Sequence, residues 1–352
     1  MNELFRTTAL ALSSMIALGG LYLHAGMSRA APASPQVESQ KAAGTPGQLG
    51  GGIQAVREYP IPTPACVPAG ITRGPDGALW FAEYGGGKIG RVTTAGDVRE
   101  FAIPTAASGP QKIAVGSDGA LWFTETDANK IGRITVAGAI SEFPVPTPNS
   151  FPAVIVAGPD GALWFTEYNA GKIGRISTQG AIHEYSIPTA RSGPQGITAG
   201  PDGALWFTES RGNKIARITT GGAVTEFAVP TEGSLPGAIA LGPDGALWFT
   251  EFNTGKIGRV TTHGAISEFP ASKGLTSASG IATGSDGALW FIDAIAGKFK
   301  RISSRGAITE FPVTGLAGKR IGAFVIGPDG AVWFTDMERG AIGRISTLAY
   351  AQ

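Results

Sequence analysis

Hydrophobic and polar positions repeat along most of this chain with a period of about 42 residues. Each repeat holds four short apolar or alternating runs separated by glycine-rich turns, and the clearest motif reads Gly-Pro-Asp-Gly-Ala-Leu-Trp-Phe-Thr-Glu at 158–167. All seven tryptophans occupy the same place in this motif, at positions 80, 122, 164, 206, 248, 290 and 333. A period of this length with four strand-like runs is typical of a β-propeller, so the sequence predicts seven blades.

The third repeat illustrates how one blade is expected to form. Its apolar or alternating runs at 154–157, 162–166, 172–177 and 182–187 predict four strands. The first two runs are separated by Pro-Asp-Gly, in which proline presets φ, aspartate bonds to nearby backbone and glycine accepts a positive φ. These turn residues favour a hairpin, and the fold class predicted is all-β with four-stranded blades.

The two ends of the repeat region complement each other. Val56–Ile61 has the pattern of a fourth strand with no blade before it, and Ala341–Ser346 has that of a third strand with no strand after it. Because an unpaired edge strand is a liability, we expect the N-terminal strand to complete the last blade and close the ring. The propeller is therefore predicted to span 53–347, with 348–352 as a tail.

The first 52 residues lack the repeat. Within 1–33 a basic residue precedes an apolar run at 8–23, and small residues follow, which indicates an export signal cleaved after Ala30 or Ala33. A retained membrane anchor is the alternative, because this run approaches the ~20 residues that span a bilayer. Residues 34–52 have the composition of a flexible linker. We expect a periplasmic or secreted protein with no membrane contact beyond the signal.

Composition narrows the classes of partner. The formal net charge is +1, and the 28 basic and 27 acidic residues recur evenly with the repeat, so no basic patch of the kind that binds nucleic acid is present in the sequence. Cys66 is the single cysteine, so no internal disulfide can form, and we expect it to be inert. We also expect His183 and His263 to lie on the surface and the protein to be a monomer.

One face of the predicted ring carries the repeat-breaking residues. Because strands alternate in direction, the fourth-to-first and second-to-third connections emerge on one face, which we call the top face. The top connections vary most between repeats, and such loops usually carry function. We predict that this face binds a small polar molecule or a protein loop. The candidate ligand-binding residues are Gln111, Lys112, Gln195, Lys273, Ser279, Arg320, Asp336 and Glu338.

An acid ends the second strand-like run of every repeat, and these acids are Glu83, Glu125, Glu167, Glu209, Glu251, Asp293 and Asp336. A lysine follows five residues later in six repeats, whereas the seventh has Ala341. The acids form either a metal or substrate ring or an acid–lysine pair inside each blade, and we favour the pair because catalytic groups are rarely needed seven times. Asp336 would then be freer to hold a cation or a ligand amine, unless Arg320 or Arg339 neutralises it.

Three motifs together resemble the virginiamycin B (streptogramin B) lyases: the tryptophan motif, then Gly-Lys-Ile-Gly-Arg-Ile, then Ile-x-Glu-Phe-x-x-Pro-Thr-Pro. The resemblance covers about 53–347. It implies magnesium-dependent linearisation of a cyclic depsipeptide by elimination across the ester, in which a base removes a proton beside a carbonyl and a metal steadies the charge. It places the family's working residues on the top face of the last two blades. Two histidines correspond to Ser279 and Gly322, and two glutamates correspond to Arg320 and Met337.

Three functions are compatible with these substitutions. The favoured hypothesis is an exported propeller that binds a ligand or protein without chemistry, since loss of a base or metal ligand usually costs orders of magnitude in rate. The second is an active lyase that uses magnesium and another base, such as Asp336 or Glu338. The third is a different exported enzyme acting on lactones or glycans. Magnesium is expected only if the family activity is retained.

Overall fold

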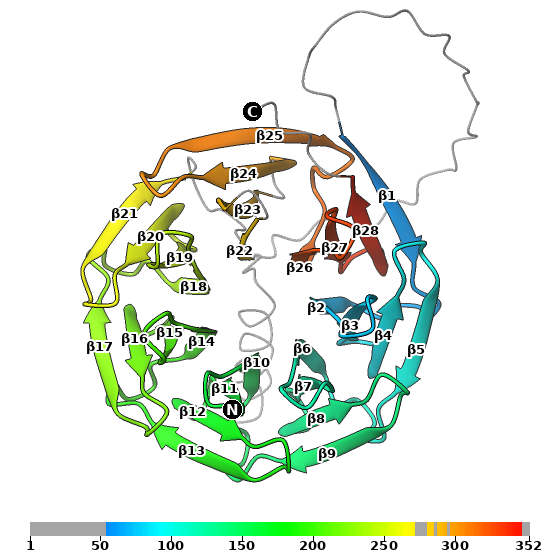
Figure 1. Ribbon diagram of the computed structural model, residues 1–352, viewed down its shortest axis with the longest axis horizontal. Coiled ribbons are helices and arrows are strands. Elements are labelled where there is room, and N and C mark those ends of the chain that lie inside the picture. The colour runs from blue at the N-terminus through cyan, green and yellow to red at the C-terminus, as the bar shows by residue number, and fades with distance from the viewer. Residues whose placement is uncertain (1–53, 272–279, 285–286, 294–295, 347–352) are drawn as a thin grey trace, which may run out of the picture.

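The computed structural model describes residues 54–271, 280–284, 287–293 and 296–346. Within them, 28 strands form seven four-stranded blades arranged in a ring (Figure 1), which confirms the predicted all-β propeller. The predicted export signal, the whole of the predicted linker and the tail lie outside the described residues. The described part contains no helix of the length and apolarity needed to cross a membrane.

Each blade runs from an inner strand outward. The inner strands are β2 (Pro68–Arg73), β6 (Pro110–Val115), β10 (Pro152–Ala157), β14 (Pro194–Ala199), β18 (Pro236–Leu241), β22 (Ile281–Thr283) and β26 (Ile321–Ile326). The second strands are β3 (Leu79–Glu83), β7 (Leu121–Glu125), β11 (Leu163–Glu167), β15 (Leu205–Glu209), β19 (Leu247–Glu251), β23 (Leu289–Asp293) and β27 (Val332–Asp336). All the second strands are fully buried, as their apolar sequences lead one to expect.

The outer half of each blade is less buried. The third strands are β4 (Lys88–Val92), β8 (Lys130–Ile134), β12 (Lys172–Ile176), β16 (Lys214–Ile218), β20 (Lys256–Val260), β24 (Lys298–Ile302) and β28 (Ala341–Ile345). The outermost strands are β5 (Val98–Ala102), β9 (Ile140–Pro144), β13 (Ile182–Ser186), β17 (Val224–Ala228), β21 (Ile266–Pro270), β25 (Ile308–Thr314) and β1 (Gln54–Pro60). In the third repeat the predicted strands agree with β10–β13 to within two residues at each boundary.

The tryptophan motif joins the turn to the core. In blade three the indole Nε1 of Trp164 donates to Asp160 Oδ1 at 3.0 Å, and Arg175 Nε donates to Asp160 Oδ2 at 2.6 Å. Trp164 also stacks on Tyr185 of the outermost strand, with ring centroids 5.5 Å apart. The predicted aspartate turn therefore does more than bond its own backbone, because it orients the tryptophan on which the next blade packs.

The N-terminal strand closes the ring as predicted. β1 pairs antiparallel with β28, with Val56 opposite Ile345 and Pro60 opposite Ala341. Tyr59 stacks on Trp333 at 5.4 Å, as the outermost aromatic does in other blades. β1 also pairs in parallel with β25 of blade six, so blades six and seven form one eight-stranded sheet (Figure 1). That second pairing was not predicted from the sequence.

Three residues outside the site agree with their predicted environments. Cys66 is buried, and burial raises the pKa of its thiol to about 11, so the reactive thiolate is disfavoured. His183 and His263 are both exposed.

Candidate functional site

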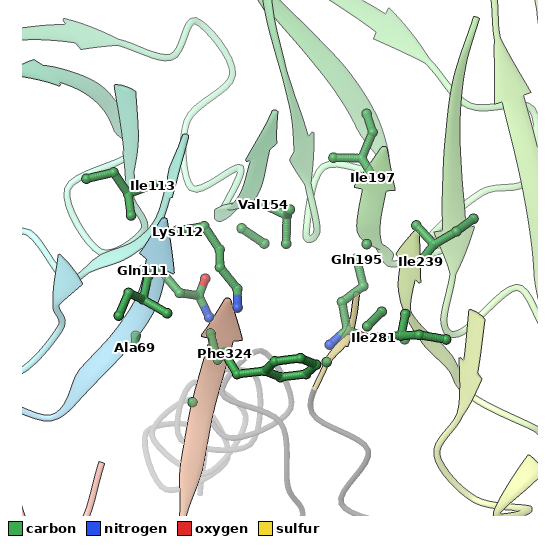
Figure 2. A pocket seen from close by; sticks show the side chains of 18 of the residues that line it. Ala69, Gln111, Lys112, Ile113, Val154, Gln195, Ile197, Ile239, Ile281 and Phe324 are labelled. Atoms are coloured by element: carbon green, nitrogen blue, oxygen red, sulfur yellow. The ribbon is translucent and has the colours of Figure 1, made fainter. Parts of the chain in front are cut away.

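A cavity of about 230 Å³ lies at the centre of the ring, where the inner strands converge. Its wall consists of residues from the inner strands and their flanks together with Met337, which belongs to the top connection between β27 and β28 (Figure 2). The cavity therefore opens towards the top face. This volume is well above the ~10–15 Å³ that one water molecule needs, so the cavity admits a small molecule.

Three of the predicted ligand-binding residues line this cavity together. Gln111 and Lys112 come from β6, and Gln195 comes from β14 (Figure 2). Gln111 and Lys112 are neighbours in the chain, and side chains of neighbouring strand residues ordinarily point to opposite faces. Both line the cavity, and β6 has a β-bulge between Pro110 and Ile113, a register shift that β2, β10, β14, β18 and β26 share. A bulge re-aims side chains and is common beside functional sites.

Hydroxyl groups hold the two glutamines. Thr126 Oγ1 donates to Gln111 Oε1 at 3.1 Å, and Ser210 Oγ donates to Gln195 Oε1 at 2.7 Å. Sequence reasoning missed Thr126 and Ser210. The signal was present, because the residue after the buried acid is a serine or threonine only where the inner strand carries glutamine. In blades one, three and five it is Tyr84, Tyr168 and Phe252, opposite an alanine or glycine.

Among the described residues that line the cavity, Lys112 is the only one with a charged side chain. Its backbone N–H donates to Thr124 Oγ1 at 3.1 Å, which anchors the bulge to the second strand. Lys112 is half-buried, and desolvation of its ammonium group inside the cavity lowers the pKa of Lys112 to about 8.

Asp336 is not left without a partner, contrary to the expectation from the loss of a lysine at Ala341. It is completely buried, and Lys319 Nζ lies 2.7 Å from its Oδ2. Lys319 comes from the connection before β26 and also forms an ion pair with Glu58 of β1. Neither Arg320 nor Arg339 neutralises Asp336, since Arg339 instead lies 3.4 Å from Glu58. Asp336 is therefore engaged in a buried ion pair.

Of the other predicted ligand-binding residues, the described ones, Arg320, Asp336 and Glu338, do not line the cavity. Arg320 and Glu338 are exposed on the top side of blade seven, and the backbone oxygen of Arg320 accepts the N–H of Met337 at 2.8 Å. Lys273 and Ser279 lie outside the described residues. The structure thus gathers Gln111, Lys112 and Gln195 at one site and leaves the blade-seven charges beside it.

Among the described residues, the acids that end the second strands form no metal ring, and none forms an ion pair with the lysine five residues later, the pairing that we favoured. In blade three Glu167 is fully buried, and burial, reinforced by the charge of Glu184, raises its pKa to about 8. Lys172 pairs instead with Glu184, at 2.9 Å. Burial opposes ionisation of Glu184, but hydrogen bonds from Thr147 and Lys172 outweigh it and lower the pKa of this carboxyl. Glu167 is therefore protonated and Glu184 ionised.

The same carboxyl pair recurs in five blades. Burial comes first among the causes that raise the pKa of the second-strand acids, to about 8 for Glu83, Glu125 and Glu167 and to about 7 for Glu209 and Glu251. Blade six differs, because the buried Lys300 lies 3.0 Å from Asp293 and 3.1 Å from Glu310. Lys300 stands where other blades have glycine or alanine, a signal that sequence reasoning missed.

Magnesium does not fit the residues that the resemblance aligns with the family's working residues. Gly322 and Met337 line the cavity, where they offer no side chain and a thioether, and Arg320 carries a positive charge. Magnesium requires a near-octahedral set of oxygen ligands, which these side chains lack. Within the described ranges no group of three or more His, Cys, Asp or Glu residues is placed to hold a metal ion.

Comparison with known proteins agrees with this assignment of the fold. The sequence profile of the virginiamycin B lyase family matches residues 41–198 and 151–350. The virginiamycin B lyase of Saccharopolyspora erythraea is 50% identical over 42 residues, a match that spans only 12% of this chain and 14% of that protein.

Solved structures give a longer match. The virginiamycin B lyase from Staphylococcus aureus is 38% identical and has a TM-score of 0.79, covering 83% of this chain and 99% of that one. A catalytically inactive variant of the S. aureus lyase, crystallised with quinupristin, is 38% identical with a TM-score of 0.78 and the same coverage. Because the family profile spans the whole propeller, the chain belongs to the virginiamycin B lyase family.

Proposed function

We propose that this protein is a binding propeller of its family, which holds a small polar or anionic molecule in the cavity and does not linearise cyclic depsipeptides. One observation carries the proposal. The polar groups of the cavity come from blades two and four, through Gln111, Lys112 and Gln195, whereas blade seven contributes Gly322 and Met337. The polar side chains of the described cavity wall therefore lie on blades two and four, away from the blade-seven positions that the resemblance aligns with the family's working residues.

The residues of the cavity support binding better than elimination. Elimination needs a base beside the reacting carbon and stabilisation of the developing negative charge. No histidine, aspartate or glutamate is among the described residues that line the cavity. An apolar wall with a few convergent polar groups is typical of a ligand site, and the positive charge of Lys112 favours an anionic group.

Quinupristin provides the first test, because the S. aureus lyase structure contains it. The full-length protein is incubated with quinupristin, with and without magnesium, and the linear product is measured by mass spectrometry. We expect no product above the buffer control, while the S. aureus lyase run in parallel gives product. Magnesium-dependent product from this protein would overturn the proposal and support the active-lyase alternative.

Binding is tested with succinate and acetate in isothermal titration calorimetry. We expect at least a tenfold loss of affinity in Lys112→Val, a change to the residue that blade three has at the same place, Val154. Equal affinities in the wild type and the variant would contradict binding in the cavity. If the protein bound neither succinate nor acetate but bound a protein loop on its top face, the result would support a protein loop as the partner instead of a small molecule.

We also propose that the protein acts in the periplasm or outside the cell. The basic residue and the apolar run at 8–23, followed by small residues, support export. Mass spectrometry of the protein from its native host should find a mature N-terminus near Ala31 or Ser34. An intact Met1 in a cytosolic fraction would refute export.

A further inference from the structure

Lys112 differs from the other lysines that the structure describes. The structure describes nine lysines, and the eight other than Lys112 each form an ion pair with a carboxylate: Lys88, Lys130, Lys172, Lys214, Lys256, Lys298, Lys300 and Lys319. Lys112 forms no such pair with any described carboxylate, and it is the one that lines the cavity. A lysine kept away from carboxylates inside an apolar wall has the environment of a nucleophilic amine.

Apart from Gln111 and Gln195, the described side chains around Lys112 in the cavity wall are apolar. Isoleucines and Phe324 form much of it (Figure 2). Gly70 of blade one leaves room for the lysine stem, because a Cβ added to Gly70 would lie 3.1 Å from Lys112 Cδ. The charged or titratable residues on the strands packed against β6 are Arg73, Glu83 and Glu125, and none of them lines the cavity.

Desolvation has a direct chemical consequence for this amine. With its pKa at about 8, roughly one quarter of Lys112 is neutral at pH 7.5, whereas an ordinary lysine is neutral in about one molecule per thousand. Only the neutral amine carries the lone pair that attacks a carbonyl carbon. Lysines desolvated in apolar pockets are the usual Schiff-base residues of proteins.

We propose that Lys112 captures small aldehydes or ketones covalently and reversibly in the cavity; this inference rests on the proposed binding function and specifies its ligand class. The neutral Nζ attacks the carbonyl carbon and forms a carbinolamine, in which the nitrogen proton passes to the oxygen through water. Loss of one water molecule then forms the C=N bond of the imine. The step is a condensation and needs neither oxidant nor reductant, and addition of water reverses it.

The cavity favours this condensation in two ways. Its volume of about 230 Å³ admits a small carbonyl compound. Its apolar wall accommodates the hydrocarbon part of the ligand, while Figure 2 shows the amide nitrogen of Gln195 directed into the same space.

Propanal with sodium cyanoborohydride tests the proposal on the full-length protein, since the hydride reduces any imine to a stable secondary amine. The products are digested, and modified lysines are located by mass spectrometry. At pH 7 we expect Lys112 to be modified at least tenfold faster than Lys172, which serves as an internal control because it pairs with Glu184. The α-amino group also reacts near neutral pH and is mapped separately.

The pH profile and two variants make the test specific. Modification at Lys112 should level off above about pH 8, whereas modification of Lys172 should keep rising, since ordinary lysines deprotonate near 10.4. Lys112→Val and Lys112→Arg should both lose the fast reaction, and the arginine variant keeps the positive charge. Melting curves identify a variant that fails to fold. In that case the modification rates of Lys112 and Lys172 in the wild-type protein still test covalent capture.

The outcomes separate this inference from the proposed function. Equal modification rates at Lys112 and Lys172 would overturn covalent capture, even if succinate binding still depends on Lys112. Fast modification at Lys112 without any succinate or acetate binding would support covalent capture and overturn reversible anion binding.

Discussion

At the scale of residues, the blades are stabilised by carboxyl groups in two different protonation states. Glu167 has no access to solvent and remains protonated, whereas Glu184 receives hydrogen bonds from Thr147 and Lys172 and remains ionised. The negative charge of Glu184 disfavours a second negative charge on Glu167, and burial determines that Glu167 is the carboxyl that keeps the proton. The protonation of each blade therefore couples its stability to pH.

We predict that Glu167→Gln stabilises the protein at pH 8. The pKa of Glu167 is about 8 in the folded state and near 4.5 when unfolded. Below pH 4.5 both states keep the proton; as the pH rises towards 8, the unfolded state releases a proton that the folded state retains, so wild-type stability falls. Glutamine resembles the protonated acid and removes this loss. The melting temperature at pH 8 should rise by about 2–4 °C per kcal/mol recovered.

Melting temperatures between pH 5 and pH 8 check this sign. The wild-type curve should fall more steeply than that of Glu167→Gln. Glu184→Gln serves as the control and should destabilise the protein near pH 7, because it deprives Lys172 of its partner. Parallel curves for the wild type and Glu167→Gln would show that Glu167 is already ionised.

The buried ion pair of blade seven gives a second prediction. Lys319→Met should cost about 3–5 kcal/mol of unfolding free energy, because it leaves the buried Asp336 uncompensated. Arg339→Ala is the matched control, since Arg339 is exposed and surface pairs contribute about 0–1 kcal/mol. Urea unfolding measures both. Similar losses in the two variants would contradict the special role of Lys319.

Residues that break the repeat within a strand were the sequence signal for the cavity, although ligand binding by them stays a prediction. Gln111, Lys112 and Gln195 differ from their counterparts in other blades, and the structure places all three in one cavity. The partner of Asp336 could not be predicted, because Lys319 lies in a connection that follows no repeat position. Its reach to Asp336 depends on the path of that loop.

At the scale of elements, β1 determines how the ring closes. Its pairing with β28 supplies the fourth strand of blade seven, and its parallel pairing with β25 ties that blade to blade six. The strand order was evident from the sequence because each strand has its own motif. The bulge in β6 was not, because a bulge is defined by the register between two strands rather than by the residues of one.

We predict that deleting residues 1–62 lowers the melting temperature strongly, whereas deleting 1–50 leaves it unchanged within error. The longer deletion removes β1, exposes the edge of β28 and takes away the ring of Tyr59 that stacks on Trp333. The shorter deletion ends before the strand begins. Differential scanning calorimetry compares the two truncated proteins, and equal melting temperatures would disprove closure by β1.

At the scale of the whole molecule, the ring is less symmetric than its sequence motif. Five blades share the carboxyl pair, while blades six and seven carry the buried lysines Lys300 and Lys319 and share one sheet. The cavity has its polar groups on blades two and four. The buried lysines of blades six and seven and the polar groups of the cavity thus lie in different sectors of the ring. Substitutions can therefore change one set without changing the other.

This separation gives the last prediction, in which the repeat supplies its own control residues. A top-face triple variant replaces Gln111 with Ala, Lys112 with Val and Gln195 with Gly, the residues found at these places in blades three and five. A bottom-face variant changes His263 and Arg305 to Gln, as at Gln179 in blade three. Both should keep the wild-type melting temperature within a few degrees, since the new residues already occur in equivalent strands or turns.

Only the top-face variant should lose binding of succinate, by at least tenfold in calorimetry, because it removes the only charge and both amides from the cavity wall. The bottom-face variant alters exposed side chains at the other end of the strands and should bind as the wild type does. If the bottom-face variant alone lost binding while both proteins stayed folded, the ligand would have to bind at the bottom face, and the cavity would not be the functional site.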